Sequence, residues 1–274
     1  MIDAIGEPGP LWLPGLAAKL AARFDAPTDA PAKASYRTSS WLGQADPLHS
    51  QCERIAIGDR TAILEDLADT DIPGLPNIQA PWREGDANQL RAALTLLDSV
   101  DGLTATLAPL VRAMHRLEAE PEYDISHSEP NLPYSIWVSI PPTGATAAVR
   151  LAESILHEAM HLQLSLIETG QPLVADAGQH AWSPWQATQR PAQGLLHGLY
   201  VFAVIFELLE ELDKVAPSIT IGDAQAEAAM CSHFRARRRQ IAEEISALPD
   251  FSAALEPAGK LLWQRCLNAL LVRV

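Results

Sequence analysis

Apolar residues recur at helical spacing over most of the chain. Spacings of three and four residues predict helices at 15–24, 60–68, 145–168, 191–213, 222–247 and 257–271. Between 87 and 119 the same spacing continues, but Gly102 interrupts it and Pro109 is expected to kink it. Residues 133–140 instead alternate in the way that is typical of a strand. The pattern therefore predicts a mainly α fold with a small β element.

The same pattern predicts two regions. Residues 1–85 are irregular apart from short helical stretches, and a proline-rich loop runs through Pro73, Pro76 and Pro81. Residues 86–274 are expected to form a mainly helical domain. The pattern leaves open whether the first region packs on that domain or forms a separate unit.

The helix predicted at 145–168 carries the pentapeptide His157-Glu158-Ala159-Met160-His161. Residues four apart lie on one face of a helix, so the two imidazoles can bind one metal ion and leave positions for water or substrate. Glu158 points about 100° away from the histidine face, which makes it a poor third ligand. The alternative is a chance match on an amphipathic helix.

A third ligand must come from elsewhere in the chain. His197 lies in the apolar run 195–209, which predicts a buried helix, and a buried imidazole needs partners for its nitrogens. Those partners are either a metal ion or a backbone carbonyl, and we favour the metal. His180 lies in a turn-rich stretch and is the weaker candidate. The sequence thus predicts that His157, His161 and His197 bind one metal ion in the domain of residues 86–274.

Further motifs resemble a known family. They are Ser183-Pro184-Trp185, Arg190-Pro191, Leu196-His197-Gly198-Leu199-Tyr200-Val201-Phe202, Asp124-Ile125-Ser126-His127-Ser128 and the segment 132–139. With the HExxH pentapeptide, they make residues 120–215 resemble the HExxH-type peptide-modification proteins of bacterial ribosomal-peptide gene clusters. One position departs from that family, in which a basic residue often follows Ser-Pro-Trp; this chain has Gln186 there.

The resemblance implies an activity. It implies a non-haem iron enzyme, dependent on Fe(II) and 2-oxoglutarate, that hydroxylates the β-carbon of a residue in a ribosomally made precursor peptide. The HExxH helix would then be the centre of a helical single-metal enzyme. Three imidazoles would replace the usual two histidines and one carboxylate. Glu158 would act beside the iron, by bonding a water, orienting a ligand histidine or contacting substrate.

Two arginines are candidates for the far carboxylate of 2-oxoglutarate, because a guanidinium offers two parallel donors. Arg190 stands just before the helix that carries His197. Arg238 falls on an apolar helix face formed by Met230, Phe234, Ile241 and Ile245. An arginine on an inward face needs an anionic partner, which is either a ligand or a carboxylate of the chain.

Two other functions fit the same residues. One is a zinc metallopeptidase in which Glu158 is the general base for a metal-bound water. However, the residues after His161, Leu162-Gln163-Leu164, lack the closely spaced third histidine of the longer zinc signature. The other is a non-catalytic protein that only binds a peptide, for which no tightly bound metal is expected.

Composition narrows the partners and the location. The net charge is −14, from 34 acidic and 20 basic residues, which argues against nucleic acid and against an anionic membrane surface. Cys52, Cys231 and Cys266 are scattered and form no Cys-x-x-Cys pair, so neither a disulfide framework nor a thiolate metal site is indicated. The N-terminus shows no signal-peptide pattern, and we expect a cytoplasmic protein.

Overall fold

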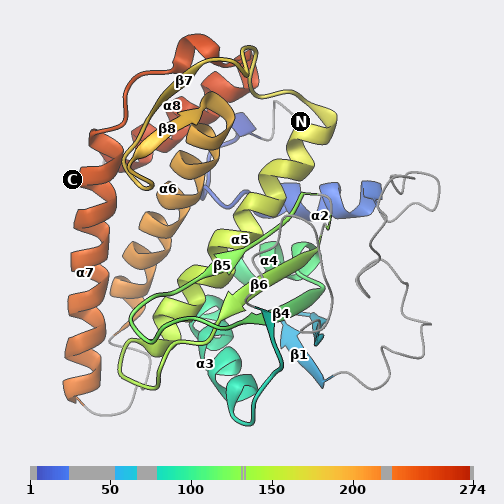
Figure 1. Ribbon diagram of the computed structural model, residues 1–274, viewed down its shortest axis with the longest axis vertical. Helices are drawn as coiled ribbons and strands as arrows, with labels where there is room; N and C mark the ends of the chain where they lie inside the picture. The colour runs from blue at the N-terminus through green and yellow to red at the C-terminus, as the bar shows by residue number, and fades with distance from the viewer. Residues whose placement is uncertain are drawn as a thin grey trace. The chain divides into compact units, whose positions relative to one another are not determined.

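The computed structural model describes residues 5–24, 53–66, 79–130, 132, 134–216 and 224–271. Helices dominate this part of the chain and a small mixed sheet accompanies them (Figure 1), which confirms the predicted class. The chain divides into two compact units: residues 17–163, here the sheet unit, and residues 1–16 with 164–274, here the helical unit. The predicted division into 1–85 and 86–274 stays a prediction.

The sheet unit is built on six strands among its described residues. They are β1 (Glu53–Ile57), β2 (Arg60–Leu64), β3 (Gln79–Ala80), β4 (Ala113–Leu117), β5 (Ser126–His127) and β6 (Ser135–Ser139). Their order is β1-β2-β4-β6-β5, and β3 pairs with β4. β4 runs parallel to both β2 and β6, whereas β5 is antiparallel to β6 and forms the end of the order. The strand predicted at 133–140 is confirmed as β6.

One helix prediction in the sheet unit is wrong, and a second is confirmed only in part. The run at 60–68 begins with strand β2, which pairs with β1 across a turn in which Gly58 has a φ of 56°. The run at 87–119 forms α3 (Asp86–Asp98) and α4 (Leu103–Leu110), but its last part is strand β4. Gly102 precedes α4 with a φ of 72°, a conformation that favours glycine, and α4 ends one residue after Pro109.

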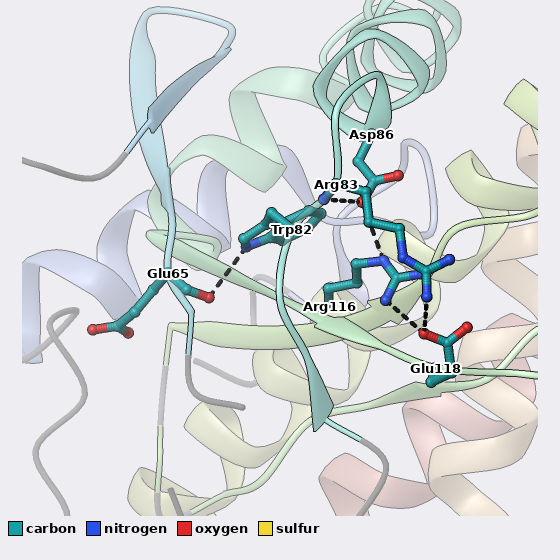
Figure 2. A network of polar contacts seen from close by, with 6 residues as sticks. All are labelled: Glu65, Trp82, Arg83, Asp86, Arg116 and Glu118. Atoms are coloured by element: carbon teal, nitrogen blue, oxygen red, sulfur yellow. Dashed lines mark hydrogen bonds and ion pairs between the residues drawn. The ribbon is translucent and has the colours of Figure 1, made fainter. Parts of the chain in front are cut away.

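A buried ion pair joins the start of α3 to β4. Figure 2 shows the Arg116 guanidinium between the carboxylates of Asp86 and Glu118. The Arg116 side chain is 5% exposed, and its Nε lies 3.1 Å from Asp86 Oδ2. The same Asp86 oxygen accepts the backbone N–H of Arg83 at 2.8 Å, and Glu118 binds the Arg83 side chain at 2.6 Å. Buried charges of this kind persist because they are paired.

Replacing Arg116 with methionine should therefore lower the free energy of unfolding by about 3–5 kcal/mol, because it leaves the Asp86 carboxylate buried without its counter-charge. Urea unfolding measures this change. The control is Arg83→Met, since the Arg83 side chain is well exposed and its removal should cost about 1 kcal/mol or less. Equal losses of unfolding free energy in the two variants would contradict the stabilising role of the buried Arg116–Asp86 ion pair.

The helical unit is organised around a long buried helix. α6 (Ala192–Val215) packs against α7 (Ala224–Ser246), against α8 (Pro257–Leu271) and against the hairpin of β7 (His180–Ser183) and β8 (Thr188–Pro191) (Figure 1). The three predicted helices are confirmed. The hairpin lies in the connection 170–190, for which no regular structure was predicted.

α6 is also apolar enough to resemble a membrane span. Among the described residues it is the one helix with the length and composition to cross a bilayer, and 72% of its apolar window is buried within the protein. Core helices of globular proteins pass the same test, so this is a weak indication of a span.

The Arg265 side chain binds the main chain of the N-terminal segment of the helical unit. Its guanidinium, on α8, donates four hydrogen bonds of 2.6–2.9 Å to the carbonyl oxygens of Ile5, Glu7, Gly9 and Pro10. Such bonds satisfy backbone groups that no helix or strand satisfies.

Leu11 attaches the same N-terminal segment to α6. Its backbone N–H donates to the buried carboxylate of Glu207 at 2.7 Å, and its carbonyl accepts from the Tyr200 hydroxyl at 3.1 Å. The chain then enters α2 (Pro14–Phe24), the helix predicted at 15–24.

Candidate functional site

The HExxH pentapeptide lies on α5 (Ala147–Gly170), as predicted. The helix contains no proline and no glycine before its last residue, and it is rich in good helix formers. It runs from the sheet unit, which ends at Gln163, into the helical unit, which resumes at Leu164. His157, Glu158 and His161 therefore belong to the sheet unit.

The two histidines of α5 lie against one another. Their Nε2 atoms are 3.2 Å apart, and the ring centroids are 4.8 Å apart at 64°. Two nitrogens bound to one ion at about 2.1 Å and separated by this distance subtend about 100°, between octahedral and tetrahedral angles. The pair fits two neighbouring ligands of one ion. The distance does not choose between iron and zinc.

Glu158 is buried and held by two serines. Its side chain is 4% exposed. Ser126 Oγ donates to Oε1 and Ser128 Oγ donates to Oε2, each at 2.6 Å. Distances this short are typical of hydroxyls bonded to an ionised carboxylate. Oε1 also lies 3.8 Å from His157 Nε2. Both serines stand in the motif of residues 124–128, but their contact with Glu158 was not predicted, although two serines two residues apart in an extended segment share one side.

The other histidines of the sheet unit lie elsewhere. His127 stands between the two serines but faces the other way, with its ring 6.2 Å from that of Trp137. His115 stacks on the same tryptophan at 4.5 Å. Burial lowers the pKa of His115 to about 3, and a hydrogen bond involving the Glu65 backbone opposes this shift. We assign both rings to the packing of the sheet.

His197 is held by a carboxylate in the helical unit. Its Nε2 lies 3.1 Å from Glu168 Oε2, and Gln193 Nε2 donates to the same oxygen at 2.8 Å. Glu168 is on α5 and Gln193 is one turn before His197 on α6. The sequence did not predict these contacts, because the partners are far apart along the chain. Glu168 is 29 residues from His197, and Gln193 is 25 residues from Glu168.

The predicted set of three imidazoles is divided between the two units. His157 and His161 belong to the sheet unit and His197 to the helical unit, so their convergence stays a prediction. Within the described residues, no group of three or more His, Cys, Asp or Glu side chains is arranged to hold a metal ion. The weaker candidate, His180, is exposed on β7, and its Nδ1 lies 2.9 Å from the Gly178 carbonyl oxygen.

The two candidate arginines pack on different parts of α6. The Arg190 guanidinium covers Gly194, where a Cβ would lie 3.0 Å from both Nε and NH2. Arg238 lies over the Phe206 ring, with Cζ 4.9 Å from its centroid and Nε buried without a hydrogen-bond partner. Across the described ranges, neither arginine forms an ion pair with a carboxylate.

The spacing along α6 separates these two arginines. Gly194 and Phe206 are twelve residues apart, which is roughly 18 Å along a helix. A small dicarboxylate cannot reach both places. Arg190 covers the residue one turn before His197, whereas Phe206 lies more than two turns beyond it. Of the two arginines, Arg190 contacts α6 nearer to His197.

Trp185, in the turn between β7 and β8, packs on α6 beside His197. Its ring stacks on Phe202 with centroids 5.1 Å apart at 21°. A Cβ on Gly198 would lie 2.7 Å from Trp185 Cζ3. The glycine next to His197 thus makes room for an aromatic ring.

Gly198→Ala should therefore displace Trp185, with a loss of about 1–3 kcal/mol in the free energy of unfolding, because the added methyl overpacks a fixed ring. Tryptophan fluorescence and urea unfolding measure the two effects. Gly15→Ala on α2 is the control, since a Cβ there meets nothing within 4 Å. An unchanged emission spectrum of Gly198→Ala would contradict this account.

Comparison with known proteins adds no relative. No protein-family model matches the chain, and no curated protein matches it. The resemblance of residues 120–215 to the HExxH-type peptide-modification proteins therefore stays a prediction.

Proposed function

We propose that this chain is an Fe(II)- and 2-oxoglutarate-dependent oxygenase that hydroxylates the β-carbon of a residue in a ribosomally made precursor peptide. The observation that carries the proposal is the His157–His161 pair, whose Nε2 atoms have the 3.2 Å separation of two neighbouring metal ligands. In this proposal α5 is the central helix of a single-metal enzyme. The substrate class and the cosubstrate come from the resemblance of residues 120–215.

His197 is the proposed third ligand, and Glu168 is its partner. A ligand imidazole commonly donates its other ring N–H to a carboxylate, which fixes the tautomer and the direction of the ring. In this proposal Nε2 of His197 is directed at Glu168, and Nδ1 is the nitrogen assigned to the ion. Gln193 binds the same carboxylate oxygen and so holds Glu168 in place.

Arg190 is the proposed partner of the far carboxylate of 2-oxoglutarate. It is half-buried and has no carboxylate partner within the described part of a chain that carries 34 acidic residues. An arginine left without an internal anion is suited to an external one. Arg238 shares this lack of a partner, but its contact on α6 is more than two turns beyond His197.

When bound, Fe(II) and 2-oxoglutarate would allow O₂ to act as the oxidant: the ketoacid would supply two electrons and become succinate and CO₂, with one oxygen atom of O₂ going to succinate and the other to the peptide. The residues of this chain hold and orient the reactants. In this proposal the histidines fix the ion, Arg190 orients the cosubstrate, and Trp185 packs over Gly198, the residue next to His197 on α6.

The decisive experiment is mass spectrometry of a precursor peptide encoded beside this gene, after incubation with Fe(II), 2-oxoglutarate and air. A gain of one oxygen that requires both O₂ and the ketoacid supports the proposal. Chain scission with a gain of water, sustained by zinc without O₂, would instead establish the metallopeptidase. A bound but unchanged peptide would indicate a non-catalytic binding protein.

Arg190→Met should raise the apparent KM for 2-oxoglutarate roughly 10- to 100-fold, because it removes charge-assisted hydrogen bonds to the far carboxylate. Arg238→Met should leave this KM unchanged, given its distance along α6. Steady-state kinetics with varied ketoacid measures both values. The exposed Arg239→Met is the control for loss of charge. A raised KM in Arg238→Met alone would contradict the role of Arg190 and assign the far carboxylate to Arg238.

A further inference from the structure

Residues 124–128, here the strap, are tied to α5 at two places. Asp124 accepts two hydrogen bonds of 2.8 Å from the Arg150 guanidinium. Ser126 and Ser128 donate to Glu158, eight residues further along α5. Eight helical residues span about 12 Å, and an extended strap of this length spans about 13 Å. The matching lengths indicate that the strap runs alongside the helix.

The opposite side of the strap is bound to β6. The Ile125 backbone N–H donates to Ser139 Oγ, and the Ser139 N–H donates to the Ile125 carbonyl, both at 2.8 Å. His127 packs on Trp137 of the same strand. Because side chains alternate along an extended segment, the two serines face α5 while His127 lies on the other face of the sheet, beside its register partner Trp137. The strap therefore connects β6 to the part of α5 that carries His157 and His161.

From these contacts we propose that Ser126 and Ser128 are positioning residues, which act through Glu158 to fix the direction of His157 and His161. Glu158 directly follows His157, so a carboxylate held at both oxygens limits rotation of this part of α5 about its axis. Oε1 lies 3.8 Å from His157 Nε2, so a shift of Glu158 changes the surroundings of that ring directly. The inference rests on the proposed metal site.

The hydrogen bonds from Ser126 and Ser128 also bear on the role of Glu158. The general base of a metallopeptidase takes a proton from the metal-bound water and then passes it on. Here each carboxylate oxygen already accepts a short hydrogen bond, and the side chain is held almost out of contact with solvent. Each oxygen of Glu158 keeps a further lone pair, but the carboxylate is fixed in place. This arrangement suits an orienting carboxylate better than a group that shuttles protons.

The test uses anaerobic Co(II) as a probe of the apo protein, without ketoacid or peptide. The double variant Ser126→Ala/Ser128→Ala should bind Co(II) roughly 10- to 100-fold more weakly than wild type and show a changed visible spectrum, as expected when an orienting group is lost. Ser154→Ala is the matched control, because its hydroxyl, also on α5, donates only to the Arg150 carbonyl. Ser126→Thr keeps a hydroxyl and should restore much of the affinity lost in Ser126→Ala.

The outcomes separate this inference from the proposed function. Wild-type Co(II) affinity and spectrum in a folded double variant would overturn the positioning role while leaving the metal site intact. Failure of the wild-type protein to bind Co(II), or equal binding by His157→Ala, would overturn both. If the double variant does not fold by circular dichroism, the single variants decide: each should weaken binding, and two single variants with wild-type affinity and spectrum would overturn the inference.

Discussion

Replacing His157 or His161 with alanine should abolish metal binding and peptide hydroxylation together. Binding energies of about 10–16 kcal/mol for four-ligand protein metal sites place about 2.5–4 kcal/mol on each ligand, so each loss should weaken affinity roughly 60- to 700-fold. The shared orientation of the two Nε2 atoms, 3.2 Å apart, is the reason for expecting equal effects. Anaerobic Co(II) titration and the oxygen-transfer assay measure the two properties.

The exposed His180 provides the matched control for loss of an imidazole, and His180→Ala should keep wild-type affinity. The histidine pair has another physical explanation, a hydrogen bond between the two rings. In that case His157→Ala would cost only about 1 kcal/mol of stability and leave metal binding unchanged. Such a result would remove the observation that carries the proposed function.

The protein should lose stability in mild acid because of His115. The pKa of this imidazole is about 3 in the folded chain, against an ordinary 6.5, since burial disfavours the charged ring. The unfolded chain therefore binds a proton below pH 6.5 that the folded chain does not bind. This contribution is fully present above pH 6.5 and is lost as the pH falls towards 3. The loss is about 2 kcal/mol between pH 7 and 5, and about 5 kcal/mol in total.

His115→Phe and His115→Leu should both flatten the dependence of unfolding free energy on pH between 7 and 5. Each variant can change the absolute stability, because His115 packs tightly on Trp137, but neither side chain titrates. Urea unfolding at several pH values gives the slope. His180→Leu should keep the wild-type slope. Parallel curves for wild type and both His115 variants would show that another group causes the acid sensitivity.

The sequence predicted helices and strands correctly where one spacing of apolar residues dominates. α5 and α6 are long, and their apolar residues return at 3.6-residue spacing over several turns, so local pattern and tertiary burial agree. β4 was missed because it is a short central strand with all five residues buried. A strand between parallel neighbours need not alternate, and β4 does not, because its buried residues include His115 and Arg116; its Met114–Leu117 spacing also fits a helix.

The site was predictable only where its parts are close in sequence. His157 and His161 were paired from their four-residue spacing, and the structure places their rings together. The partners of Glu158 are 32 and 30 residues away, and the partner of His197 is 29 residues away. Nothing local in a sequence specifies such contacts, because they depend on which strand edge or helix face the fold brings alongside.

The contact of Arg265 with carbonyl oxygens has a consequence for how this chain tolerates variation. A guanidinium that binds only main-chain oxygens is indifferent to the side chains at the exposed positions Glu7 and Pro8. In a saturation-mutagenesis library, most substitutions at these two positions should survive. Position 265 should reject nearly every replacement, because no other residue offers so many donors in one plane.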